Sequence, residues 1–191
     1  MSKQFVHLHN HSSYSILDGA SKIKDMVAEV KKQGQPGVGI SDHGNLYGLV
    51  DFYKECKAHD IKPVLGIEAY FSDDRLLKEK IKQTDAFGDI SGSDKRYYHL
   101  TLFAENNDGY RNLIKLSSDA FMNGMFYKPR MDWSTISKHS SGVICTSGCL
   151  GGPVLQKLLF DDYDGALAAA ARLQDIFGRE NFFMELMNHG L

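Results

Sequence analysis

The sequence predicts an α/β protein in which strands and helices alternate. Short apolar runs, such as residues 37–40 and 62–70, have the length and composition of buried strands. Between such runs lie segments with apolar residues at helical spacing, of which the alanine-rich stretch 163–177 is the clearest. A chain of 191 residues with 42% hydrophobic content can bury a sizeable core as one domain.

The elements follow one another in a regular order. The first predicted strand covers residues 5–9, which alternate apolar and polar side chains, and Ser21 and Gly34 bracket the first helix. The further predicted strands cover residues 37–40, 62–70, 97–103, 142–147 and 181–187, and the predicted helices residues 22–32, 49–59, 106–117 and 163–177. Residues 72–96 are polar and irregular, and we expect a mobile surface excursion there. Helices between strands predict parallel pairing through right-handed crossovers, in either a barrel or an open sheet.

Composition excludes several classes of protein. With 22 Lys and Arg against 24 Asp and Glu, the net charge of −2 argues against holding duplex DNA by bulk charge, although a local basic groove stays open. The sequence has no run of 18 apolar residues, so no membrane helix is expected. The first residues lack the apolar middle of a signal peptide, which predicts a cytoplasmic location. Three cysteines do not indicate a disulfide framework.

Polar side chains gather where predicted strands end. They are His9 and His11, Asp42 and His43, Glu68, and Cys149. The carboxyl ends of parallel strands meet at one edge, where the active sites of α/β proteins lie. His99 is the exception, because it comes early in its predicted strand.

These residue types are those of a metal site. His9 and His11, at positions i and i+2 of an extended segment, point the same way and can converge on one cation. The whole candidate set is His9, His11, Asp18, His43, Glu68, His99 and Cys149. Such a mixture of nitrogen, oxygen and sulfur suits zinc, manganese or iron better than calcium or magnesium alone, although magnesium remains a candidate. The set exceeds what one ion can use, so a cluster of two or three divalent ions is predicted.

Each residue taken alone also has an ordinary structural interpretation. A His-x-His pair can be a polar strand edge, and Asn45 can cap a helix. His99 can be a core histidine, and Cys149 a buried thiol. Glu68 is harder to explain in this way, because a carboxylate on an apolar strand needs a partner.

Several segments together resemble the polymerase and histidinol phosphatase (PHP) domain. They cover residues 5–12, 14–19, 41–46, 66–70, 99–101, 146–149 and 185–191. More narrowly, the chain is similar over its full length to the PHP domain at the N-terminus of bacterial DNA polymerase III alpha subunits. The resemblance implies a distorted barrel of seven β/α units with up to three metal ions at its C-terminal face.

The resemblance also implies site residues. The metal ligands, catalytic through the ions they hold, would be His9, His11, Asp18, His43, Glu68, His99 and Cys149. His7 stands where many members have an aspartate, and Cys149 where the phosphatase branch often has a histidine. The last metal motif, Asp-x-His after a seventh strand, is expected beyond residue 191. Residues 1–191 would then be the N-terminal part of a PHP domain, with six of its strands.

The function implied by the resemblance is metal-dependent phosphoesterase activity within DNA replication. In active members this is a 3′–5′ exonuclease, which proofreads a DNA 3′ end beside the rest of a polymerase, in cis or in trans. We expect this chain alone to be weak or inactive and unable to polymerise. A catalytically inactive structural or interaction module is the alternative. A histidinol-phosphate-type phosphatase is a further one, against which residues 14–19 and 185–191 argue.

Overall fold

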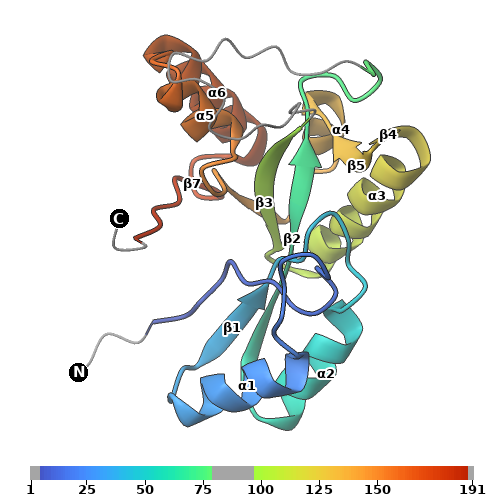
Figure 1. Cartoon of the computed structure of the whole chain (residues 1–191), viewed down its shortest axis with the longest axis vertical. Coiled ribbons are helices and arrows are strands. Elements are labelled where there is room, and N and C mark those ends of the chain that lie inside the picture. The colour runs from blue at the N-terminus through green and yellow to red at the C-terminus, as the bar shows by residue number, and fades with distance from the viewer. Residues whose placement is uncertain (1–4, 79–96, 189–191) are drawn as a thin grey trace.

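A computed structural model describes residues 5–78 and 97–188, which form a mixed α/β architecture (Figure 1). The helices are α1 (Ile23–Lys32), α2 (Leu49–Ala58), α3 (Asn107–Asn123), α4 (Trp133–Lys138), α5 (Pro153–Leu159) and α6 (Tyr163–Phe177). The strands are β1 (Gly37–Ile40), β2 (Lys62–Phe71), β3 (Tyr98–Ala104), β4 (Met125–Phe126), β5 (Lys128–Met131), β6 (Val143–Thr146) and β7 (Phe182–Phe183). The predicted α/β class is confirmed, and the predicted excursion at residues 72–96 lies mostly outside the described residues.

Strand β2 organises the sheet. The order is β4-β5-β2-β3-β6-β7, and β1 pairs with the first half of β2. Because β3 occupies one edge of β2 along residues 66–71, β5 must pair with Tyr70 and Phe71 on the other edge. In the described part of the chain this order has two ends, at β4 and β7. Figure 1 shows β2 and β3 running through the middle of the molecule, with α1 and α2 beside β1 and the other helices around the far half.

The expectation of parallel pairing throughout is wrong. Strand β3 runs antiparallel to β2, and β6 runs antiparallel to β3. Parallel pairing needs a crossover, and the sequence pattern shows no helix between residues 72 and 96, so the crossover rule had no basis at that connection. Two reversals make β6 parallel to β2. The ends of β2 and β6 and the start of β3 therefore meet at one edge of the sheet.

The first predicted strand does not form a regular ladder. The backbone NH of Gly39 donates to the His7 carbonyl (2.7 Å) and that of Ser41 to the Asn10 carbonyl (2.8 Å). From the first bond to the second, the N-terminal segment advances by three residues, from His7 to Asn10, and the β1 segment by only two. The two segments therefore lose their register, and no regular ladder forms. The Asn10 side chain compensates by donating to the carbonyls of His7 and Gly39, each at 3.1 Å.

The pleat of β2 separates the core from the polar edge. Ile67, Ala69 and Phe71 face a core cluster that includes residues of α3 and α6. Glu68 and Tyr70 alternate with them and point to the opposite face. A second cluster joins α1 and α2 to β1. No helix in the described ranges combines the length and apolarity needed to cross a membrane.

Two short helices were not predicted from the sequence, although each begins with residues that favour a helix N-terminus. Helix α5 begins with Pro153, which suits a first helical turn. Helix α4 begins with a capping box: Asp132 accepts from the Thr135 NH (2.9 Å), and the Thr135 hydroxyl accepts from the Asp132 NH (3.0 Å). Arg75 also donates to Asp132 at 3.1 Å. This carboxylate therefore fixes the segment after β5.

Replacing Asp132 by Ala should destabilise the fold by about 1–2 kcal/mol, because a buried helix cap and one of the two carboxylate partners of Arg75 are lost together. Burial acts to raise the pKa of Asp132, but bonds from Thr135, Ser134 and Arg75 outweigh it and lower the pKa. The stabilisation is therefore full above the ordinary value of about 4 and is lost as the pH falls below it. Urea unfolding at pH 7 and pH 3.5 measures both effects.

The matched control is Asp175→Ala, at an exposed position of α6, which should change stability by less than about 0.5 kcal/mol. Equal midpoints for the two variants at pH 7 would contradict the role given to Asp132.

Candidate metal centre

The Glu68 carboxylate is the centre of a cluster of histidines. Its side chain is only 1% exposed. Oε2 lies 3.2 Å from His9 Nε2, 3.0 Å from His11 Nε2 and 3.2 Å from His43 Nδ1, while Oε1 lies 3.0 Å from His99 Nδ1. Four imidazoles from three separate parts of the chain thus surround one buried carboxylate.

The sheet brings His43 and His99 to Glu68. His43 follows β1, where its neighbour Gly44 donates to the Glu68 carbonyl at 2.9 Å. His99 pairs in register with Tyr70, two residues beyond Glu68. The antiparallel direction of β3 places its start at the carboxyl end of β2. This explains why His99 belongs to the cluster although it comes early in its strand.

His9 and His11 come from the segment that runs beside β1. Gly39 allows this close approach, because a Cβ there would lie 2.4 Å from the Leu8 carbonyl oxygen. Both Nε2 atoms face Glu68 Oε2, as expected for side chains at i and i+2 that point the same way, while their convergence on a cation stays a prediction. The His11 ring stacks on His43 with centroids 4.2 Å apart and planes within 8°.

Asp42 anchors the loop that carries His11 and Asp18. Its Oδ1 accepts from the Ser12 NH (2.6 Å) and the Ser15 hydroxyl (3.1 Å), and its Oδ2 from the Ser12 hydroxyl (2.8 Å). Ser15 in turn accepts from the His43 NH at 2.8 Å. The sequence marked Asp42 only as a polar strand end, and this anchoring role was missed.

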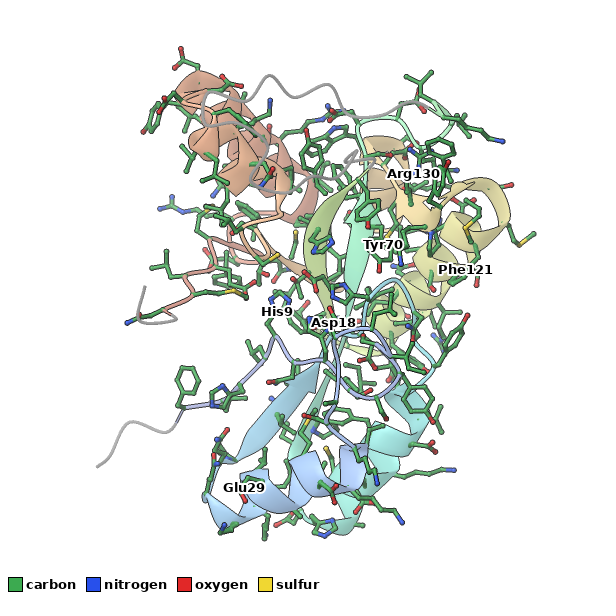
Figure 2. All side chains as sticks on the ribbon, viewed as in Figure 1. His9, Asp18, Glu29, Tyr70, Phe121 and Arg130 are labelled. Atoms are coloured by element: carbon green, nitrogen blue, oxygen red, sulfur yellow. The ribbon has the colours of Figure 1, made fainter. Side chains whose placement is uncertain are left out.

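Asp18 and Cys149 complete the predicted set. Asp18 Oδ2 lies 2.6 Å from His43 Nε2, and the side chain is half exposed. Cys149 Sγ lies 3.5 Å from Glu68 Oε1 and 3.6 Å from His99 Nδ1, and it accepts from the Gly151 NH. In Figure 2 the labelled His9 and Asp18 lie near the middle of the molecule, below Tyr70. All seven predicted side chains therefore meet, while their role as ligands stays a prediction.

His7 stands apart from this cluster. Its ring packs edge-on against Phe5 with centroids 4.8 Å apart. It lines a separate cavity with Asn10 and residues of α1, such as Glu29 and Val30.

Sequence reasoning missed Glu185. Its Oε1 lies 2.7 Å from His9 Nδ1, and its Oε2 accepts from the Thr146 hydroxyl at 2.6 Å. Residue 185 lies inside the strand that the sequence predicts over residues 181–187, whereas β7 ends at Phe183. With the shorter strand, Glu185 would have counted as another polar residue at a strand end.

Burial and charge oppose each other throughout the cluster. Burial acts to raise the pKa of Glu68, but His11, His9 and His99 outweigh it and hold that pKa far below its usual value. Burial acts to lower the pKa of His9, yet Glu185 and Glu68 raise it to about 10. Burial also acts to lower the pKa of His99, yet Cys149 and Glu68 raise it to about 9. At His43 burial prevails, and the pKa is lowered. The buried carboxylate thus stays ionised and requires nearby positive charge.

The donor set fits a divalent ion. Glu68 Oε2 and His43 Nδ1 are buried and have no hydrogen-bond partner among the described residues, although three imidazole nitrogens lie within 3.2 Å of Oε2. Two ligand atoms on one ion, each at about 2.0–2.2 Å, would be separated by roughly 2.8–3.6 Å, depending on the angle between them. Two overlapping groups share Glu68 and could each hold an ion: His9, His11 and Glu68, and His43, Glu68 and His99.

Comparison with known proteins identifies the family of this chain. The PHP domain family matches residues 7–189, so the chain belongs to the PHP family. It is 47% identical to DNA polymerase III subunit alpha of Mycobacterium tuberculosis over 98% of this chain and 16% of that protein. It is 45% identical to the same subunit of Saccharopolyspora erythraea, with the same coverage. The chain thus spans about a sixth of the length of these relatives.

The chain also resembles solved structures, among them some of low sequence identity. One is a protein of Bifidobacterium adolescentis, provisionally described as a metal-dependent phosphoesterase. It is 17% identical, with a TM-score of 0.41 over 62% of this chain and 33% of that one.

Replacing His9 and His11 together by Ala should remove most of the bound metal, because two nitrogens facing Glu68 are lost. The purified chain, supplemented with zinc or manganese, should carry at least about one equivalent, measured by elemental analysis. The matched control is His59→Ala with His139→Ala, which removes two histidines outside the cluster. Equal metal content in the two double variants would contradict the ligand assignment.

Proposed function

We propose that the chain is the PHP module of a replicative polymerase, similar to DNA polymerase III subunit alpha, and hydrolyses phosphodiesters with the help of metal ions. One observation carries the proposal: a buried carboxylate shared by four imidazoles, with a second carboxylate and a thiol beside it. Such a set suits zinc, manganese or iron, with magnesium a further candidate. The reaction proposed is 3′–5′ exonucleolytic proofreading.

The residues that would hold two or three ions are His9, His11, Asp18, His43, Glu68, His99 and Cys149. Divalent ions in such a site lower the pKa of water and neutralise the charge that develops on a phosphoryl group. Glu68 would contribute to both candidate groups, because His11 and His43 face its Oε2 and His99 faces its Oε1. Asp42, through Ser12 and Ser15, keeps His11, Asp18 and His43 in place.

The chain also offers a positive charge for a nucleic-acid phosphate. The Lys128 Nζ lies 5.3 Å from the centre of the Tyr70 ring, which stacks on His43 with centroids 5.9 Å apart. A net charge of −2 leaves little long-range attraction for DNA, so local cations beside the cluster must supply it. We therefore propose the 3′ end of a DNA strand as the substrate.

The relatives are polymerase subunits about six times longer than this chain, which supports a module that works with further polypeptide. The described residues already form seven strands, one more than the six predicted from the sequence, because β4 and β5 were not foreseen and residues 5–9 form no ladder. We propose that further polypeptide, in cis or in trans, supplies one more strand and an Asp-x-His motif. A role in replication also implies a location in the cytoplasm.

The test is hydrolysis of a 3′-ended single-stranded oligonucleotide with added manganese or zinc. Both this chain and a chain extended along the downstream reading frame are assayed. The extended chain should shorten the strand from its 3′ end, and this chain should be slower. His43→Ala should reduce the rate at least about 10–100-fold, since even residues that merely support metal ligands cost that much. His59→Ala, outside the cluster, should leave it unchanged.

The other outcomes separate the alternatives. Metal binding without hydrolysis by either chain would favour a structural module of the polymerase. Hydrolysis of histidinol phosphate but not of the oligonucleotide would favour a small-molecule phosphatase. Equal and robust rates for both chains, abolished by His43→Ala, would contradict the need for a further strand.

A further inference from the structure

Glu185 joins the C-terminal part of the chain to the histidine cluster. It lies 176 residues from His9 in sequence, yet its Oε1 is 2.7 Å from His9 Nδ1. The carboxylate side chain is 16% exposed, so it is largely removed from water. A buried carboxylate of this kind needs hydrogen-bond donors on both of its oxygens.

Both oxygens of Glu185 have such donors. The Thr146 hydroxyl donates to Oε2 at 2.6 Å, and the His9 ring nitrogen faces Oε1. An ionised carboxylate only accepts, so the bond to His9 requires the proton of that ring on Nδ1. The opposite nitrogen, Nε2, is the one that faces Glu68 at 3.2 Å. The Glu185 and Glu68 carboxylates therefore lie against the two ring nitrogens of His9, one at each.

The backbone around Glu185 is held by the sheet. Its NH donates to the Ser147 hydroxyl at 2.9 Å. Just before it, β7 pairs with β6 in parallel, with Phe183 opposite Thr146. The strand pair that presents Thr146 to Glu185 thus also places the carboxylate beside His9.

We propose that Glu185 is a positioning residue, which fixes the tautomer and ring orientation of His9 so that Nε2 binds metal. The proposal rests on the metal centre described above but not on hydrolysis. A carboxylate that accepts from the second nitrogen of a metal-binding histidine orients the ring and raises its basicity. Binding is reciprocal, so metal bound at His9 must in turn stabilise the attachment of residues 182–188 to β6.

The first test is zinc affinity, measured by competition with a chelating dye. Glu185→Ala should weaken zinc binding about 10–100-fold, because His9 loses its orienting acceptor. Glu185→Gln keeps an oxygen that can accept from Nδ1 and should recover part of that loss. Glu180→Ala is the matched control, since this exposed glutamate lies outside the cluster. Circular dichroism of each metal-free variant verifies its fold.

The second test is amide hydrogen exchange over residues 182–188, with and without zinc. Zinc should slow exchange there in the wild-type chain and much less in Glu185→Ala. Zinc affinity in Glu185→Ala equal to wild type, or no recovery in Glu185→Gln, would overturn the proposal, as would failure of the wild-type chain to bind zinc. Zinc binding that depends on Glu185, in a chain that hydrolyses no phosphodiester, would support this inference while the proposed function failed.

Discussion

The burial of the Glu68 carboxylate is the constraint on which the site depends. Removing an ion of this kind from water costs several kcal/mol unless opposite charge and hydrogen bonds compensate. The carboxylate is only 1% exposed, so water does not solvate it, and four imidazoles of the chain surround it. Their nitrogens and its two oxygens form two overlapping groups of donor atoms, His9 with His11 and His43 with His99, each of which could hold a cation.

The long strand β2 makes this arrangement possible. Its alternate residues face the apolar core, which leaves Glu68 and Tyr70 on the polar side. Its two edges accept β3 and the segment around His43, each of which delivers a histidine. The N-terminal segment passes this edge and brings His9 and His11. Asp42 fixes this segment through Ser12, and Glu185 contacts the His9 ring. Histidines that are far apart in the sequence are thus brought to Glu68 by their positions relative to one strand.

Much of the site was predictable because its signals are local. The i, i+2 spacing of His9 and His11 and a carboxylate on an apolar strand follow from backbone geometry alone. The direction of β3 was not predictable, because β3 pairs with β2, which precedes it by more than 25 residues, and no local pattern sets the direction of that pairing. Glu185 was missed because the extent of β7 is set by its pairing with β6, which no local pattern reveals. Residues 5–9 alternate like a strand, but an extra residue in their register prevents a ladder.

Anomalous X-ray diffraction from crystals of the chain grown with zinc or manganese would show whether Glu68 binds a metal ion. Data collected at the absorption edge of the metal locate each ion independently of the protein atoms. We expect an ion within about 2.0–2.2 Å of a Glu68 oxygen, with imidazole nitrogens at a similar distance. An anomalous map with no peak at Glu68 after metal loading, or with peaks only elsewhere, would contradict this expectation. The Glu68 carboxylate would then be neutralised by protonated histidines alone.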